Sequence, residues 1–104
     1  MKLKEVVLAE EYLGSCIFEV KVPHSTRNAF GYMHGGAMAT YLDICTTVAL
    51  YAFDEKQRSH VSTALDIKYF NAAKVDSTVI FEARISKIGR NIAYTEGIMK
   101  TEDQ

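Results

Sequence analysis

Apolar residues recur at two different spacings along this chain, and the two spacings predict strands and one helix. Within residues 15–22 the apolar side chains occupy every second position, which is typical of a strand with one buried face. Those positions are Cys16, Phe18, Val20 and Val22. A shorter apolar-rich segment, 5–9, precedes this strand, and a loop ending at Gly14 joins the two. Residues 23–33 contain Pro, Ser, Asn and Gly and are expected to form a loop.

The spacing becomes helical over residues 35–53. The polar residues of this stretch, together with the residue that follows it, fall on one stripe of the predicted helix. They are Thr40, Asp43, Thr47 and Asp54. Because most of the remaining circumference is apolar, we expect a helix that is covered on several sides, as by a curved sheet.

Three further strands are predicted after the helix, because the period returns to two. They span 61–69, 79–85 and 92–101, and the last two are joined by a hairpin turn at Gly89-Arg90-Asn91. The expected fold class is therefore α+β, with one long helix packed on one antiparallel sheet.

Length and composition narrow the range of functions. A chain of 104 residues predicts one domain, 1–104, and a formal net charge of -1 gives no electrostatic reason to expect nucleic acid as a partner. Cys16 and Cys45 form no CxxC pair, which argues against a zinc cluster or a disulfide framework. The longest apolar run, 48–53, is too short to span a bilayer. We expect a cytoplasmic protein, with a mitochondrial location as the alternative.

Two adjacent glycines, Gly35 and Gly36, open the predicted helix directly after His34. Glycine brings no Cβ, so the free N–H groups of the first helical turn stay accessible at the positive end of the helix dipole. One explanation is a tight junction between loop and helix. The other is a binding site for negative charge, since each glycine costs about 1 kcal/mol relative to alanine inside a helix.

Asp43 is a carboxylate in the middle of this apolar helix. If its stripe faces water, Asp43 is an ordinary surface residue. If a partner covers the stripe, desolvation would raise the pKa of Asp43 and make it a candidate general base. Taken singly, Asn28 is typical of a turn and Ser62 of a strand.

Together these residues form a spaced pattern. It consists of Asn28, Gly31, His34, Gly35 and Gly36, then Asp43, then Val61, Ser62, Leu65, Ile67 and Tyr69. This pattern resembles the hotdog-fold acyl-CoA thioesterases, in the branch of the phenylacetyl-CoA (PaaI-like) thioesterases and the thioesterase superfamily members. The hairpin beginning at Gly89-Arg90 is similar to that family too, and the resemblance extends over roughly residues 5–101.

The resemblance implies a fold, an assembly and an activity. The fold is a central helix wrapped by an antiparallel sheet. The assembly is a homodimer joined through the strand around residues 60–70, which commonly pairs again into a tetramer, with the active site between subunits. The activity is hydrolysis of an acyl-CoA thioester. No metal and no cofactor are expected, because coenzyme A is part of the substrate.

The resemblance also assigns roles to single residues. The Gly35 N–H forms the oxyanion hole, while His34 and Asn28 orient or polarise the thioester. Asp43 of the other subunit acts as general base or as nucleophile, and Ser62 positions the attacking water. The further expected substrate contacts are Gly36, Tyr32, Met33 and Arg90.

The chain departs from the family pattern at its C-terminal end. Family members usually continue after the turn near residues 102–103 into a final strand, which lies in the sheet between the strand ending near Thr101 and the one around Ser62. We therefore expect a C-terminally short domain. Either the sequence is a truncated version of a longer chain, or the gap is closed by rearrangement or by strand donation. The departure leaves a second function open, a non-catalytic module that binds acyl-CoA. The preferred acyl group does not follow from the sequence.

Overall fold

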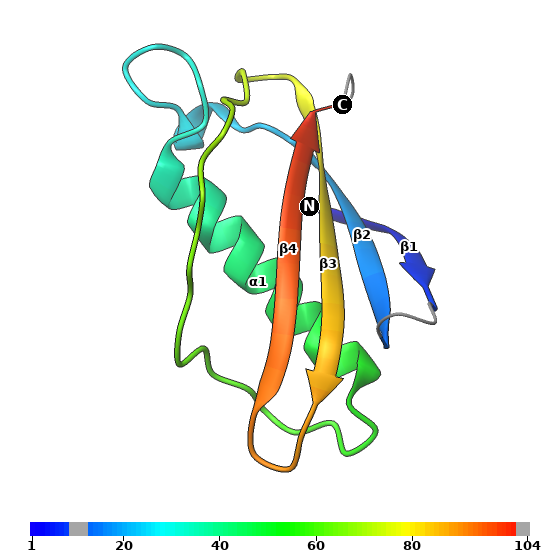
Figure 1. The fold of residues 1–104 in the computed structure, drawn as a ribbon. Coiled ribbons are helices and arrows are strands. Elements are labelled where there is room, and N and C mark those ends of the chain that lie inside the picture. Colours follow the sequence, from blue (N-terminus) through cyan, green and yellow to red (C-terminus); the bar gives the residue numbers. More distant parts are fainter. Residues whose placement is uncertain (9–12, 102–104) are drawn as a thin grey trace.

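The fold is one antiparallel sheet with one long helix on one face (Figure 1). The computed structural model describes residues 1–8 and 13–101. Its elements are β1 (Lys2–Val7), β2 (Gly14–Lys21), a short 3₁₀ helix (His24–Thr26), α1 (Gly35–Phe53), β3 (Thr78–Ile88) and β4 (Ala93–Thr101). The strands lie in the order β1-β2-β3-β4, and each pairs antiparallel to its neighbour. The predicted α+β class is confirmed.

The core lies between α1 and the two central strands. Phe18 of β2 sits opposite Phe81 of β3, and the Phe81 ring stacks on Tyr41 of α1 with ring centroids 5.6 Å apart. The predicted inner faces of both strands are buried, every member being at most 3% exposed. These residues are Cys16, Phe18, Val20, Val22, Val79, Phe81, Ala83 and Ile85. The alternation of apolar residues therefore identified the buried face of both strands.

Helix α1 has the predicted bounds and contacts the sheet closely on one side. Gly97 of β4 makes this possible, because a Cβ there would lie 3.0 Å from Leu42 and 3.2 Å from Thr46. The opposite side of α1 carries the exposed residues Ile44, Val48 and Tyr51. In the single chain the sheet covers one side of α1 and the segment after the helix lies along another, while the side with these three residues stays exposed. By length and composition α1 is also long and apolar enough to cross a membrane, a property that it shares with the core helices of globular proteins.

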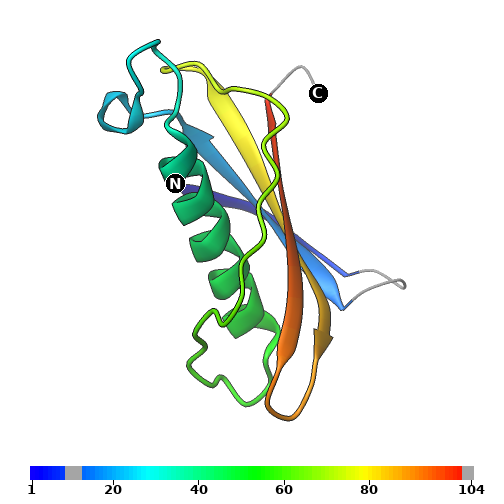
Figure 2. The same cartoon turned by 60° about the vertical axis from the view of Figure 1, so that its left-hand side comes forward.

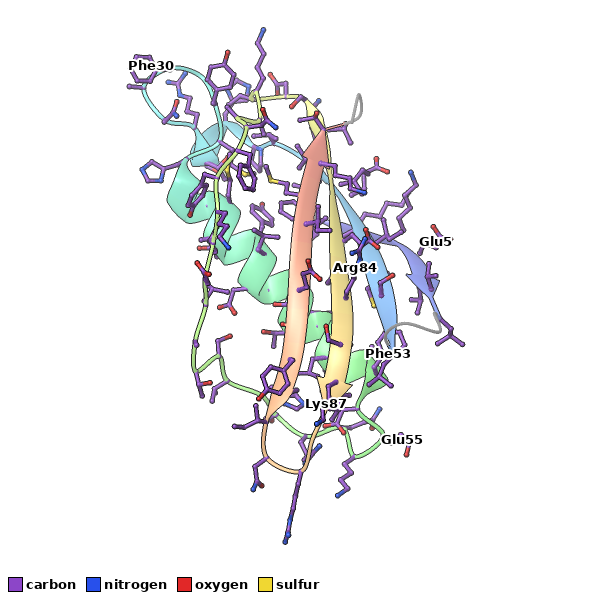
Figure 3. All side chains as sticks on the ribbon, viewed as in Figure 1. Glu5, Phe30, Phe53, Glu55, Arg84 and Lys87 are labelled. Carbon is purple, nitrogen blue, oxygen red and sulfur yellow. The ribbon has the colours of Figure 1, made fainter. Side chains whose placement is uncertain are left out.

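The two ends of α1 lie far apart. Figure 3 shows Phe30 in the loop that leads into the helix, and Phe53 and Glu55 at the opposite end, close to the end of β3 that carries Lys87. The hairpin between β3 and β4 lies at this second end, and its predicted turn is confirmed by a hydrogen bond from the Gly89 N–H to the Ile92 carbonyl. Loop and hairpin therefore mark opposite ends of the molecule.

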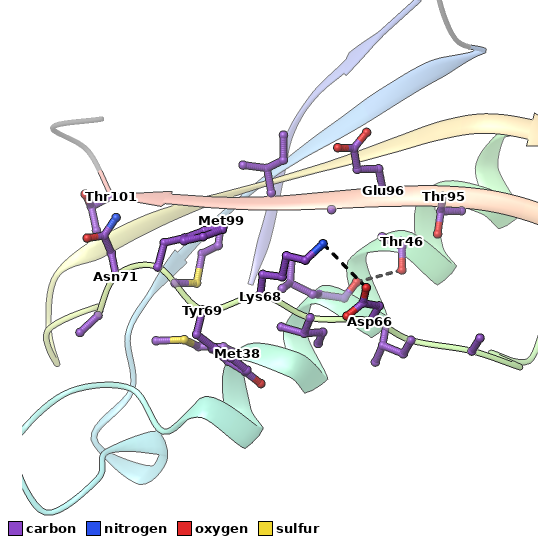
Figure 4. A pocket seen from close by; sticks show the side chains of 18 residues that line it. Met38, Thr46, Asp66, Lys68, Tyr69, Asn71, Thr95, Glu96, Met99 and Thr101 are labelled. Atoms are coloured by element: carbon purple, nitrogen blue, oxygen red, sulfur yellow. Dashed lines mark hydrogen bonds and ion pairs between the residues drawn. The ribbon is translucent and has the colours of Figure 1, made fainter.

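The predicted strand 61–69 is not a strand in this structure. Residues 61–73 run lengthwise along α1 as an extended segment outside the sheet (Figure 2). A cleft of about 580 Å³ separates this segment from β4 (Figure 4), and its floor includes Met38, Leu42 and Thr46 of α1. A strand needs a neighbour that satisfies its backbone groups, and the described part of the chain supplies none here. The cleft lies where the resemblance places the final strand. The predicted turn at 102–103 and the loop residues 9–12 fall outside the described residues.

Candidate functional site

Asn28 organises the loop that precedes α1. Its side-chain oxygen accepts hydrogen bonds from the backbone N–H groups of Phe30, at 2.9 Å, and Tyr32, at 3.2 Å. The turn requires Gly31 at φ 85°, a backbone conformation that glycine adopts without strain. The oxygen is thus used within the loop, and in the described part of the chain the Asn28 side-chain amide nitrogen remains without a partner. Asn28 therefore keeps a hydrogen-bond donor for other partners.

His34 caps the start of α1. Its Nδ1 accepts a hydrogen bond from the Gly36 N–H at 3.0 Å, and its carbonyl accepts one from the Ala37 N–H at 2.9 Å. Because Nδ1 is an acceptor, a neutral His34 carries its proton on Nε2. The imidazole therefore offers a donor on the side that faces away from the helix.

The Gly35 N–H is the free donor of the first helical turn. Four N–H groups at a helix start lack partners inside the helix, and here those of His34, Gly36 and Ala37 all have acceptors, with Thr26 supplying its carbonyl to His34. For the Gly35 N–H, residues 1–8 and 13–101 provide no acceptor. A single unpaired donor at the positive end of a helix suits an oxygen that gains negative charge.

The four other residues that were expected to contact the substrate lie in different environments. The Gly36 N–H donates to His34, so it is not free for a ligand. Met33 is 2% exposed and packs in the core, so its expected contact with the substrate is wrong. Tyr32 is partly exposed beside Asn28. Arg90 lies in the β3–β4 hairpin, at the end of the molecule opposite to the start of α1.

Asp43 and Ser62 form the second group of site residues. The Ser62 hydroxyl donates to Asp43 Oδ1 at 2.5 Å, although Ser62 lies on the extended segment rather than on a strand. Asp43 is half-buried, and among the described residues its Oδ2 has no hydrogen-bond partner. The structure thus brings these two expected site residues into contact, and one oxygen of the Asp43 carboxylate keeps its hydrogen-bonding capacity.

The two groups are too far apart to form one site within a single chain. Asp43 lies eight positions after Gly35 in α1, which is about 12 Å along the helix axis. An oxyanion donor and a base that serve the same carbonyl group each act over about 3 Å, so they lie roughly 6–8 Å apart. One chain thus carries two separate groups of candidate site residues, which we call half-sites. The first half-site is Asn28, His34 and Gly35, and the second is Asp43 and Ser62.

Tyr69 links the extended segment to the first half-site, a contact that the sequence interpretation missed. Its hydroxyl donates to the Gly35 carbonyl at 3.0 Å, and its ring lies where a Gly35 Cβ would touch it at 3.4 Å. Tyr69 is the last residue of the spaced pattern, and this membership was the sequence signal that could have identified the contact.

A buried carboxylate at the end of α1 was missed too. Asp54 was placed on the polar stripe, yet it is 4% exposed, forms an ion pair with Arg58 and is hydrogen-bonded to His60. The hydrogen bond from the Arg58 guanidinium holds the pKa of Asp54 well below its ordinary value, so Asp54 is ionised at neutral pH. An aspartate at a helix end with arginine four residues later is the sequence signal that indicates such a cluster.

The two thiols do not take part in this arrangement. Cys16 and Cys45 are both 1% exposed, and burial raises the pKa of Cys45 to about 12. A thiol that stays protonated is a poor nucleophile. Cys45 therefore packs as a small apolar residue.

Comparison with known proteins identifies the family. Residues 30–104 match the Thioesterase superfamily. Human acyl-coenzyme A thioesterase 13 is 33% identical over 93 residues, which cover 89% of this chain and 66% of the relative. The chain thus spans slightly less than two thirds of the length of this curated relative.

Solved structures agree on the fold. Zebrafish thioesterase superfamily member 2 superposes with a TM-score of 0.80 at 31% identity, covering 95% of this chain and 70% of that one. A hypothetical thioesterase from Streptococcus pneumoniae, solved with coenzyme A, gives a TM-score of 0.79 at 19% identity, with 96% and 78% covered. The matched segment, the identity and the shared architecture together establish that the chain belongs to the thioesterase superfamily and has the hotdog fold.

Proposed function

We propose that this protein is an acyl-CoA thioesterase that hydrolyses a thioester to coenzyme A and a carboxylic acid. The observation that carries the proposal is the unpaired Gly35 N–H at the start of α1, capped by His34. Hydrolysis places negative charge on the carbonyl oxygen in the transition state, and a preorganised backbone donor stabilises that charge.

The relatives support the substrate class. The human relative is named an acyl-coenzyme A thioesterase, and the structure from Streptococcus pneumoniae contains coenzyme A. A second bacterial structure with this fold, from Streptococcus mutans, was solved with acetyl-CoA. An acyl-CoA is thus the thioester to test first.

The separation of the half-sites supports a homodimer. If the first half-site of one subunit meets the second half-site of its partner, each dimer contains two complete sites related by its two-fold axis. The extended segment carries exposed apolar side chains suited to such an interface, namely Val61, Leu65, Tyr69 and Phe70. The exposed side of α1, with Ile44 and Val48, offers a second apolar surface through which two dimers pair.

In the proposed reaction, the thioester carbonyl oxygen accepts the hydrogen bond of the Gly35 N–H. Asp43 of the partner subunit removes a proton from water, and the hydroxyl oxygen bonds to the carbonyl carbon. The tetrahedral intermediate then collapses, the carbon–sulfur bond breaks, and the coenzyme A thiolate takes the proton back from Asp43. Atoms and charge balance, because water supplies the hydroxyl of the acid and the hydrogen of the thiol.

The other residues orient these groups. The hydroxyl of Ser62 donates to Asp43 Oδ1, which leaves Oδ2 to act on the water that Ser62 helps to place. Nε2 of His34 and the side-chain amide of Asn28 act as donors toward the thioester end of the substrate. Direct attack by the Asp43 carboxylate, giving a mixed anhydride that water then cleaves, uses the same arrangement.

The purified chain is expected to release free coenzyme A from acyl-CoA. The measurement is a thiol-release assay across short, medium, long-chain and aryl acyl-CoA substrates. The buried thiols of Cys16 and Cys45 contribute little background to it. Calorimetric binding of a non-hydrolysable acyl-CoA analogue without turnover of any thioester would contradict the proposal and favour the acyl-CoA-binding module.

A further inference from the structure

Asp54 is a buried charge that the proposed reaction does not use. It is the C-cap of α1, and its side chain is 3% exposed. A carboxylate without partners is costly to bury, but Asp54 accepts five hydrogen bonds. Oδ1 accepts from the Lys56 N–H and from Arg58 Nη2, while Oδ2 accepts from the Arg58 N–H, Arg58 Nε and His60 Nε2, at distances of 3.0–3.4 Å.

These contacts fix the chain that leaves the helix. The two-pronged pairing of the Arg58 guanidinium with both carboxylate oxygens restricts orientation as well as distance. Arg58 Nη1 also donates to the Arg90 carbonyl at 2.8 Å, which ties the turn to the β3–β4 hairpin. His60, held on the other side of the same carboxylate, is the last residue fixed before the extended segment begins. We call Asp54, Arg58 and His60 the Asp54 cluster.

The cluster ends two residues before Ser62. Ser62 lies outside the sheet, so no ladder of backbone hydrogen bonds holds it in register. Within the described residues, its position against Asp43 depends on its own hydroxyl, on the Asp54 cluster upstream and on the hydrogen bond from Tyr69 downstream. Of the two flanking anchors, the Asp54 cluster is nearer in sequence and the more buried.

We infer that Asp54, through Arg58 and His60, is a positioning residue that holds Ser62 against the Asp43 carboxylate. The inference rests on the proposed function for its kinetic consequence. Asp54 itself touches neither substrate nor reacting atoms. Because a displacement of about 1 Å at a catalytic group can lower a rate by as much as a hundredfold, loosening the cluster should slow hydrolysis without altering the groups that react.

The kinetic test uses Asp54→Asn, which keeps the side-chain size but places an NH₂ group among the donors. We expect kcat to fall roughly tenfold to a hundredfold with little change in KM. In a Ser62→Ala background the same substitution should have no further effect on kcat, because the hydroxyl group that Asp54 positions is already absent. The matched control is Glu55→Gln, the same chemical change at the exposed neighbouring position, which should leave kcat unchanged.

A second measurement does not depend on hydrolysis. Backbone ¹⁵N order parameters of residues 61–64 should fall below about 0.6 in Asp54→Asn and stay high in Glu55→Gln. If Asp54→Asn does not fold, His60→Ala and His60→Gln replace it, since glutamine can keep the donor to Asp54 and alanine cannot. Only His60→Ala should then loosen residues 61–64.

The outcomes separate this inference from the proposed function. If the wild-type chain hydrolyses no thioester, the proposed function fails, and the order parameters alone decide whether Asp54 positions Ser62. Unchanged order parameters in a folded Asp54→Asn or His60→Ala variant would overturn the inference. Equal losses of kcat in the wild-type and Ser62→Ala backgrounds would overturn it as well, because they would indicate a purely structural effect.

Discussion

Replacing Asp43 with asparagine should lower kcat for acyl-CoA hydrolysis by about 10²–10⁴-fold, the range for loss of a general base. Asparagine matches the shape of aspartate, and its side-chain oxygen can still accept the hydrogen bond from Ser62. The substitution thus removes the negative charge and the proton acceptor while it preserves the local contact. KM should change little, since Asp43 acts on water rather than on the bound substrate.

The measurement is steady-state thiol release, with thermal unfolding and native mass recorded in parallel. Glu55→Gln serves as the control for the chemical change, because its side chain lies on the surface beyond the end of α1. A folded Asp43→Asn protein of unchanged native mass that retains wild-type kcat would exclude Asp43 from the reaction.

Replacing Gly35 with proline should lower kcat by about 10²–10³-fold, the cost of removing one oxyanion-hole donor. Proline lacks the N–H group, yet it is well tolerated at the first position of a helix. The preceding residue must then be extended, and His34 already is, with φ -61° and ψ 140°. The backbone at this position therefore suits proline, so the lost donor should dominate the result.

Gly35→Ala is the matched comparison for this second prediction. It retains the N–H, and its Cβ would meet the Tyr69 ring at 3.4 Å, an ordinary van der Waals contact. The alanine variant should therefore keep most of the activity that the proline variant loses. Equal activity of the two variants would mean that the Gly35 N–H does not stabilise the oxyanion.

The sheet and the helix were predictable because their signals are local. The period of two in β2 and β3 marks a buried face that packing against α1 then fills. The bounds of α1 follow from the glycine pair after His34 and from the loss of the apolar pattern at Asp54. Neither conclusion required knowledge of the neighbouring element.

The extended segment could not be predicted in the same way. Residues 61–69 alternate as a strand does, but a strand exists only when a neighbour pairs with it, and that depends on what lies in the cleft beside β4. The burial of Met33 and Asp54 is likewise a property of the assembled fold. Met33 packs in the core with Ala73, a residue far along the chain whose carbonyl also accepts its N–H. Asp54 is covered where Arg58 folds back onto it.

The sequence pointed to some of the residues that the structure brings together, but it missed Tyr69 and gave the geometry only in part. The Asp43–Ser62 contact and the free Gly35 N–H agree with the roles that the resemblance implies. The use of the Gly36 N–H within the His34 cap does not follow from residue types, because it depends on which ring nitrogen faces the helix.

The most direct test of the two half-sites is complementation between two inactive variants. Asp43→Asn and Gly35→Pro should each be inactive as homodimers. A mixed dimer contains one site with intact Gly35 from one subunit and intact Asp43 from the other. After subunit exchange at equal concentrations, half of the dimers are mixed and one of their two sites is intact, so about a quarter of wild-type activity should return. Subunit exchange confirmed by native mass spectrometry with no recovery of activity would contradict a site shared between subunits.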